Sequence, residues 1–270
     1  MNNYKKPIIA FFAMLLIQAI VSVVVLVPGA IYELMKMAAA GQEPNPEVLI
    51  ERLTSGSSIM SIALIVSSII TIFFMQTPMK MIRLKDSFAM PNISLGKSVY
   101  LVLAAFIGIY ATDIVSEVMD LPNIIEAELG NMSKTVMGVL AIAIIGPLAE
   151  EVVFRGAIQQ HLHTNGERPF RAIFIASVLF GLMHMNPAQI PFAFVVGLIL
   201  GVFYWKTGSL VLPCVIHMLN NGISCWLSNT MGDELSFVDA LGGTTIAICV
   251  AVVGLALSGY VLYSWATEKE

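Results

Sequence analysis

The sequence predicts an all-α fold, a polytopic transmembrane helical bundle of about eight spans. Hydrophobic residues make up 57% of the 270 residues and charged residues only 12%, and the mean hydropathy is +0.84. This composition is too apolar for a soluble domain of this length. Apolar stretches long enough to cross a bilayer recur along the chain, with polar connections between them. We therefore expect a single transmembrane domain over residues 1–270.

Eight apolar stretches are the expected spans. They are residues 8–27, 58–76, 99–118, a fourth that starts near 135, then 172–184, 190–205, 210–227 and 240–265. The first is too long for the apolar region of a signal peptide, and no clear small-residue cleavage site follows it. The fifth and seventh stretches are interrupted by polar residues, so one of them could be re-entrant. The three cysteines lie in apolar stretches, where we expect them to pack as small apolar residues.

The distribution of positive charge predicts the orientation in the membrane. Lys and Arg gather at the N-terminus and in the second, fourth and sixth connections, whereas the other connections hold few of them. Cytoplasmic connections carry the excess of Lys and Arg in membrane proteins. We therefore expect a multi-pass protein of the plasma membrane with both termini in the cytoplasm.

Two adjacent glutamates, Glu150 and Glu151, lie within the fourth apolar stretch. An ionised side chain at membrane depth costs about 3 kcal/mol on insertion scales, so such residues are candidates for function. Arg155 follows Glu151 by four residues and can pair with it on one helix face. Glu150 is turned about 100° away on the helix. It has no partner within its own helix, and we expect that partner on another segment.

Polar side chains also occur in three other stretches. His184 ends the fifth stretch, and water at a helix end could satisfy it. His217 and Asn221 lie four residues apart in the seventh stretch, where they could simply hydrogen-bond between helices. Asp113 and Glu117 share a helix face near the end of the third stretch, and we expect water at the membrane surface to solvate both.

Four of these residues, Glu150, His184, His217 and Asn221, are expected to converge on one water-filled pocket. Scattered through lipid, each would carry its own burial cost. A glutamate and a histidine can deprotonate a bound water. A second histidine and an asparagine amide can stabilise the oxyanion of a tetrahedral intermediate. This set suits an amide hydrolase without a serine or cysteine nucleophile. A zinc site of Glu150, His184 and His217 is the competing interpretation, although no His-Glu-x-x-His motif is present and the asparagine would then be surplus.

Three motifs resemble the signatures of a known family, in order and each on its own apolar segment. They are Glu150-Glu151-x-x-x-Arg155, Phe180-x-x-x-His184 and His217-x-x-x-Asn221, with Gly146-Pro147, Gly156 and Lys206-Thr207-Gly208-Ser209 as matching flanks. The family is that of CAAX-processing endopeptidases and bacteriocin-processing or immunity proteins, also called CPBP or Abi. The similarity covers about residues 138–221, under half of the chain.

The resemblance implies a glutamate-dependent intramembrane protease similar to the CAAX prenyl endopeptidase, with its catalytic core at about 135–228. By position, Glu150 and His184 would activate the water, while His217 and Asn221 would form the oxyanion hole. Glu151 and Arg155 would be a supporting pair. The resemblance favours a mechanism without a cofactor, and zinc is the alternative. The expected partners are membrane lipid and a peptide or membrane-protein substrate, and no nucleic acid.

Two functions of other classes compete with the protease. One is a non-catalytic membrane immunity or scaffold protein, in which the polar residues only hold helices together. The other is a small-solute or proton transporter, although the sequence shows no clear inverted repeat. Convergence separates these interpretations, because only an enzyme needs the polar side chains around one site. The sequence does not identify the substrate.

Overall fold

The computed structural model describes residues 3–46, 48–49, 58–231 and 236–268, and in these ranges the protein is helical, with no strand. The predicted all-α fold is thus confirmed. Each expected apolar stretch contains a helix or a continuous series of helical segments. The single helices among them are α1 (Lys5–Ala39), α3 (Ser58–Gln76), α5 (Leu95–Met119), α10 (Pro169–Met183), α11 (Gln189–Thr207), α12 (Val211–Met231) and α14 (Thr244–Thr267).

The fourth stretch is a continuous series of five helical segments. These are α7 (Val136–Leu140), the π-helical η1 (Ala141–Ile145), α8 (Gly146–Glu151), the π-helical η2 (Val152–Gln159) and α9 (Gln160–Thr164). Short helices in the connections between the described spans include α4 (Leu84–Ser87), α6 (Glu126–Ser133) and α13 (Phe237–Ala240).

The predicted count of eight spans needs a correction. Within the described ranges, six helices are long and apolar enough to cross a membrane: α1, α3, α5, the series from Val136 to Thr164, α11 and α14. Helix α10 has 15 residues, or about 22 Å, which is short of a hydrocarbon layer of about 30 Å. Helix α12 has 21 residues but is interrupted by polar ones. Helices α10 and α12 correspond to the fifth and seventh apolar stretches, which polar residues interrupt in the sequence.

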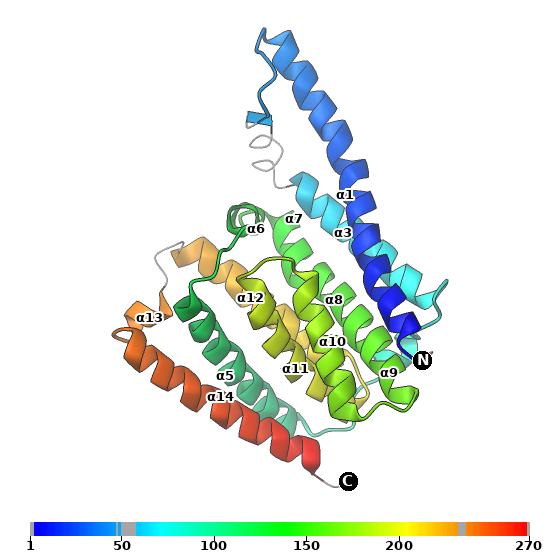
Figure 1. The fold of residues 1–270 in the computed structure, drawn as a ribbon, viewed down its shortest axis with the longest axis vertical. Coiled ribbons are helices and arrows are strands. Elements are labelled where there is room, and N and C mark those ends of the chain that lie inside the picture. Colours follow the sequence, from blue (N-terminus) through cyan, green and yellow to red (C-terminus); the bar gives the residue numbers. More distant parts are fainter. Residues whose placement is uncertain (1–2, 47, 50–57, 232–235, 269–270) are drawn as a thin grey trace.

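Helix α1 is longer than the sequence suggests. A polar connection was expected from residue 31, but the helix continues to Ala39 with Pro28 inside it. Most residues after Pro28 are good helix formers, which explains the extension. Figure 1 shows this end of α1 projecting beyond the rest of the bundle. The end of that connection, residues 50–57, lies outside the described residues.

The connections meet at two opposite ends of the bundle. At one end, Asn3 donates to the Asn165 carbonyl, Lys97 binds Glu268 at 2.6 Å, and Ser209 donates to the Ala89 carbonyl. At the other end, the backbone N–H of Ala188 donates to the Pro122 carbonyl, and the Asn229 amide donates to the Ser133 carbonyl. Figure 1 shows both termini near the first end, which we call the terminal end.

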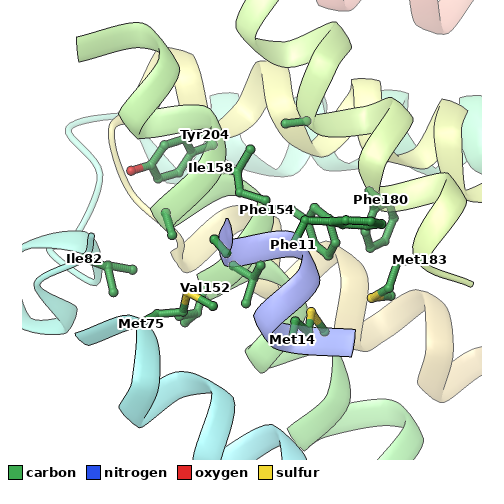
Figure 2. Packing of buried hydrophobic residues seen from close by; sticks show 14 of the residues in the cluster. Phe11, Met14, Met75, Ile82, Val152, Phe154, Ile158, Phe180, Met183 and Tyr204 are labelled. Atoms are coloured by element: carbon green, nitrogen blue, oxygen red, sulfur yellow. The ribbon is translucent and has the colours of Figure 1, made fainter. Parts of the chain in front are cut away.

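The main hydrophobic core surrounds η2. Val152, Phe154 and Ile158 are fully buried and belong to one cluster with side chains of α1, α3 and α10. Figure 2 shows Phe11 and Met14 of α1 beside this segment. The residues that directly follow the paired glutamates therefore occupy the centre of the core, which fixes the position of the glutamates.

Helices α10 and α11 approach each other closely through small residues. A Cβ atom on Gly197 would lie 2.9 Å from the Ser177 Cβ, and one on Gly181 would lie 2.8 Å from the Ile190 carbonyl oxygen. Neither position has room for a side chain. Such small-residue contacts let helix backbones pack closely in membrane proteins, and here they fix the helix that ends next to His184.

We predict that Gly197→Ala lowers the melting temperature of the purified protein, because the new methyl group collides with Ser177. Overpacking of this kind costs about 1–3 kcal/mol. Gly259→Ala on α14 is the matched control, since a Cβ there meets no atom within 4 Å and alanine is the better helix former. Equal melting temperatures for the two variants would show that close approach at Gly197 is not required.

Candidate active site

The paired glutamates lie on a short α-helical segment between two π-helical turns. π-helical turns are rare and occur frequently at functional sites. Pro147 lacks a backbone N–H and therefore cannot donate within the helix. A Cβ on Gly146 would lie 2.9 Å from the Ala141 carbonyl oxygen, so the wide turn favours glycine there. These contacts give a physical reason for the Gly146-Pro147 pair that precedes the glutamates.

Glu151 is fully buried and contacts two basic side chains. Its Oε1 lies 3.0 Å from Arg155 Nη1 and 2.9 Å from His217 Nδ1. The predicted pairing of Glu151 with Arg155 is present in the structure. The contact with His217 was not predicted, because it joins α8 to α12. A carboxylate only accepts hydrogen bonds, so Nδ1 of His217 carries the proton in this contact.

Arg155 is also buried, with 1% of its surface exposed. Its Nη2 donates to the Gly197 carbonyl at 3.3 Å, and its guanidinium carbon lies 4.4 Å from the centre of the Phe180 ring. One turn later, Gln159 Nε2 donates to the Gly201 carbonyl at 2.9 Å. Arginine above an aromatic face is an attractive arrangement. These contacts join η2 to α10 and α11.

Glu150 has a different environment from its neighbour. Its side chain is 16% exposed, and its Oε2 lies 3.7 Å from His217 Nε2. The partner expected on another segment is therefore His217, which lies between the two glutamates. A separation of 3.7 Å is too long for a hydrogen bond. The Glu150 carboxylate remains available to another donor.

His184 lies at the end of α10 and contacts the site through Phe180. Its Nδ1 is 2.9 Å from the Phe180 carbonyl oxygen, which can only accept, so this nitrogen donates. The Phe180 ring packs edge-on against the rings of both histidines, with centroid distances of 5.1 Å to His184 and 5.7 Å to His217. Among the described residues, no ion pair joins His184 to a glutamate.

Asn221 is held by hydrogen bonds on both sides of its amide. Its Nδ2 donates to the Ile142 carbonyl of η1 at 3.0 Å, and its Oδ1 accepts from Asn220 Nδ2 at 3.1 Å. An amide nitrogen has two N–H groups, so one is left for another acceptor. The sequence did not single out Asn220, because a spacing of four residues pairs His217 with Asn221 and does not identify the amide next to Asn221.

Of the four predicted residues, Asn221 alone lines the cavity of about 660 Å³, together with Asn220. Glu150, His184 and His217 are not among the lining residues of this cavity. The buried ring of Phe180 contacts the rings of both histidines. Glu150 and Glu151 therefore both lie next to His217. His184 is linked to His217 through the Phe180 ring, and Asn221 is linked to the fourth helical series through the Ile142 carbonyl of η1.

The donor set of the zinc alternative does not converge in this arrangement. Among the described residues, no three His, Cys, Asp or Glu side chains are placed to hold a metal ion. Glu150 and His217 are neighbours, whereas His184 contacts the Phe180 ring that also packs against His217. We therefore derive no step through a metal.

One expectation for the third helix is wrong. Glu117 was expected to be solvated at the membrane surface, but its carboxylate accepts hydrogen bonds from the Ser236 hydroxyl and from the backbone N–H groups of Phe237 and Val238. The first N–H groups of a helix have no partner within that helix, and Glu117 supplies an acceptor for α13. Asp113, its expected companion, lines the 660 Å³ cavity.

Comparisons with known proteins match the segment that holds this site. Residues 132–223 match the family of type II CAAX prenyl endopeptidases described as Rce1-like. The chain is also 40% identical over 86 residues to the membrane-embedded CAAX protease MroQ of Staphylococcus aureus (strain USA300). That alignment covers 30% of this chain and 35% of the relative. No solved structure matches. The segment that matches the Rce1-like CAAX endopeptidase family includes the paired glutamates, Arg155, both histidines and Asn221.

Proposed function

We propose that this protein is an intramembrane endopeptidase that hydrolyses a peptide bond in a membrane-associated peptide or protein. The observation that carries this proposal is the difference between the two glutamates. Glu151 is buried and neutralised by Arg155, whereas Glu150 is partly exposed and makes no direct hydrogen bond. A partly exposed carboxylate that is free of direct hydrogen bonds and lies beside a histidine is suited to act as a general base. The family match of residues 132–223 supports the same chemistry.

In this proposal, Glu150 and His184 activate a water molecule. Nδ1 of His184 donates to the Phe180 carbonyl, so the other ring nitrogen can accept a hydrogen bond from water. The Glu150 carboxylate removes a proton as the water oxygen attacks the scissile carbonyl carbon. The same proton then passes to the leaving amine when the C–N bond breaks, and the carboxylate is regenerated.

His217 and Asn221 stabilise the oxygen that becomes negative during the attack. The remaining N–H of the Asn221 amide is one donor, because the Ile142 carbonyl occupies the other. His217 binds Glu151 through Nδ1 and turns Nε2 toward Glu150. A proton on Nε2 makes this nitrogen the second donor. Donors fixed in this way before the reaction stabilise the transition state at little reorganisation cost.

The two glutamates should respond differently to the same substitution. Glu150→Gln should lower turnover by about 10²–10⁴, the contribution of a general base, with an unchanged melting temperature. Glu151→Gln should lower the melting temperature, because it leaves Arg155 buried without its charge partner, and breaking such a pair costs about 3–5 kcal/mol. Turnover of a membrane peptide and thermal melting are measured on both variants. Equal loss of activity at equal stability would contradict the assignment.

Asn221→Ala should lower kcat by about 10²–10³ with little change in KM, the effect of removing one oxyanion donor. Asn229→Ala is the matched control, because Asn229 also lies on α12 and donates to a backbone carbonyl, that of Ser133. Both variants lose one such hydrogen bond, but only Asn221 is assigned to the reaction. Lower stability with normal turnover in both variants would show that Asn221 only joins helices and is not an oxyanion donor.

The same preparations test the proposal that no metal takes part. A strong chelator should leave the wild-type turnover unchanged, since there would be no metal ion for it to withdraw. Inactivation by the chelator and recovery with zinc would overturn the metal-free mechanism and restore the zinc alternative.

We further propose that the terminal end of the bundle faces the cytoplasm of a cell whose plasma membrane holds the protein. Lys5, Lys97, Arg168 and Lys206 lie at or near this end, as expected for cytoplasmic connections. A reporter inserted at Asn165 should therefore be cytoplasmic, and one inserted at Pro44 should be outside. Reporters on the same side of the membrane would refute this topology.

A further inference from the structure

The 660 Å³ cavity lies beside the proposed active site and toward the end of the bundle opposite the termini. Its lining comes from α5, α6, η1, α11, α12 and α13, and it includes both Asn221 and Ile142. Asn221 is the residue assigned to the oxyanion, and its amide donates a hydrogen bond to the Ile142 carbonyl. Binding sites for ligands commonly have volumes of about 300–1,000 Å³. The cavity is therefore large enough for several side chains of a peptide.

The lining of this cavity is strongly acidic. It contains Asp113, Glu117, Asp120 and Glu126 and neither lysine nor arginine. Glu117 is already bound to the start of α13. In the part of the chain that the structure describes, the other three carboxylates form no hydrogen bond or ion pair through their side chains. Three negative charges in the cavity are thus left for a positively charged ligand.

Asp113 lies within the apolar helix α5 and not at its end. It precedes the end of α5 by six residues, or about 9 Å. Acidic residues at such depth are expensive in lipid and persist where they line a water-filled cavity or meet a partner. A single metal ion does not fit, because no three acidic, histidine or cysteine side chains in the described ranges are grouped closely enough. A long cationic side chain can reach carboxylates that are spread along a wall.

Asn220 provides a second and independent sign of a ligand. It lines the same cavity and is only 7% exposed. Its Nδ2 donates to Asn221, but its Oδ1 accepts no hydrogen bond from any residue that the structure describes. This oxygen is not among the fully buried unpaired side-chain atoms of the described residues, so it is accessible from the cavity that Asn220 lines. The backbone N–H of a peptide in the cavity would supply a donor.

We propose that this cavity is the cleft that holds the substrate peptide beside the scissile bond. Asn220 Oδ1 accepts a peptide N–H, and Asp113, Asp120 and Glu126 select a peptide with a Lys or Arg side chain in this part of the cleft. The location of the scissile bond rests on the proposed endopeptidase function. The charge selectivity does not, because it is a property of binding.

The test measures binding separately from cleavage. Full-length Glu150→Gln protein in nanodiscs of uncharged phosphatidylcholine is titrated against fluorescent ten-residue apolar peptides. Each peptide carries one Lys or, in its matched partner, one Gln, at successive positions. At the best position, the Lys peptide should bind about 10- to 100-fold more tightly than its Gln partner, the range for a charge-assisted hydrogen bond. The difference should shrink in high salt.

Variants of the lining locate the selectivity. Adding Asp113→Asn and Glu126→Gln should reduce the Lys preference to within about twofold. Glu128→Gln is the matched control, since Glu128 lies on the same helix α6 but does not line the cavity. Asp120→Asn is a second variant that should keep the fold, because Asp120 has a φ of 46° and asparagine tolerates this region well. It should also weaken the preference.

Parallel cleavage assays with wild-type protein separate the two proposals. Lys-selective binding that the lining variants abolish supports the cleft, whether or not any peptide is cut. Failure to cut any peptide would count against the endopeptidase and not against the cleft. Cleavage with equal kcat/KM for Lys and Gln peptides, together with equal binding, would overturn the cleft proposal and leave the endopeptidase standing. An unchanged Lys preference in the lining variants would also overturn it.

Discussion

The architecture depends on one buried contact, that of Glu151 with Arg155 and His217. Three charged or polar side chains at this depth are tolerated only because each neutralises or binds another. Arg155 extends the contact to the Gly197 carbonyl and the Phe180 ring. Side chains or carbonyls from the fourth helical series, α10, α11 and α12 thus meet around one carboxylate. Removing that carboxylate affects the mutual position of four elements at once.

This contact also explains how two adjacent glutamates can have different roles. Successive side chains on a helix point about 100° apart, so two adjacent glutamates do not both point into the core. Glu151 enters the core and is neutralised by Arg155, which leaves Glu150 near His217 but free of a direct hydrogen bond. The imidazole is oriented by the buried glutamate and presents its second nitrogen to the exposed one. A structural pair and a chemically available acid therefore share one dipeptide.

Local spacing in the sequence was sufficient to predict the helices and the Glu151–Arg155 pair, because residues four apart on a helix are neighbours. Contacts between helices depend on how the helices pack, and periodicity does not report this. The contact of His217 with Glu151, the amide of Asn220 beside Asn221 and the binding of Glu117 to α13 were therefore missed. Six of the described helices have the length and apolarity of a span, two fewer than the predicted stretches. Helix α10 has only 15 residues, and α12 is interrupted by polar side chains that contact neighbouring elements.

The position of Asn221 constrains how a peptide could reach the glutamates. Asn221 borders the acidic cleft and also holds the η1 carbonyl of Ile142, two turns before Glu150 on the same helical series. Glu150, His184 and His217 do not line that cleft. In the proposed mechanism, a peptide in the cleft would present its carbonyl at the Asn221 amide, and a water activated by Glu150 would attack that carbonyl. On this basis, the acidic residues of the proposed cleft would select the substrate without taking part in the chemistry, whereas Asn221 would contribute to both.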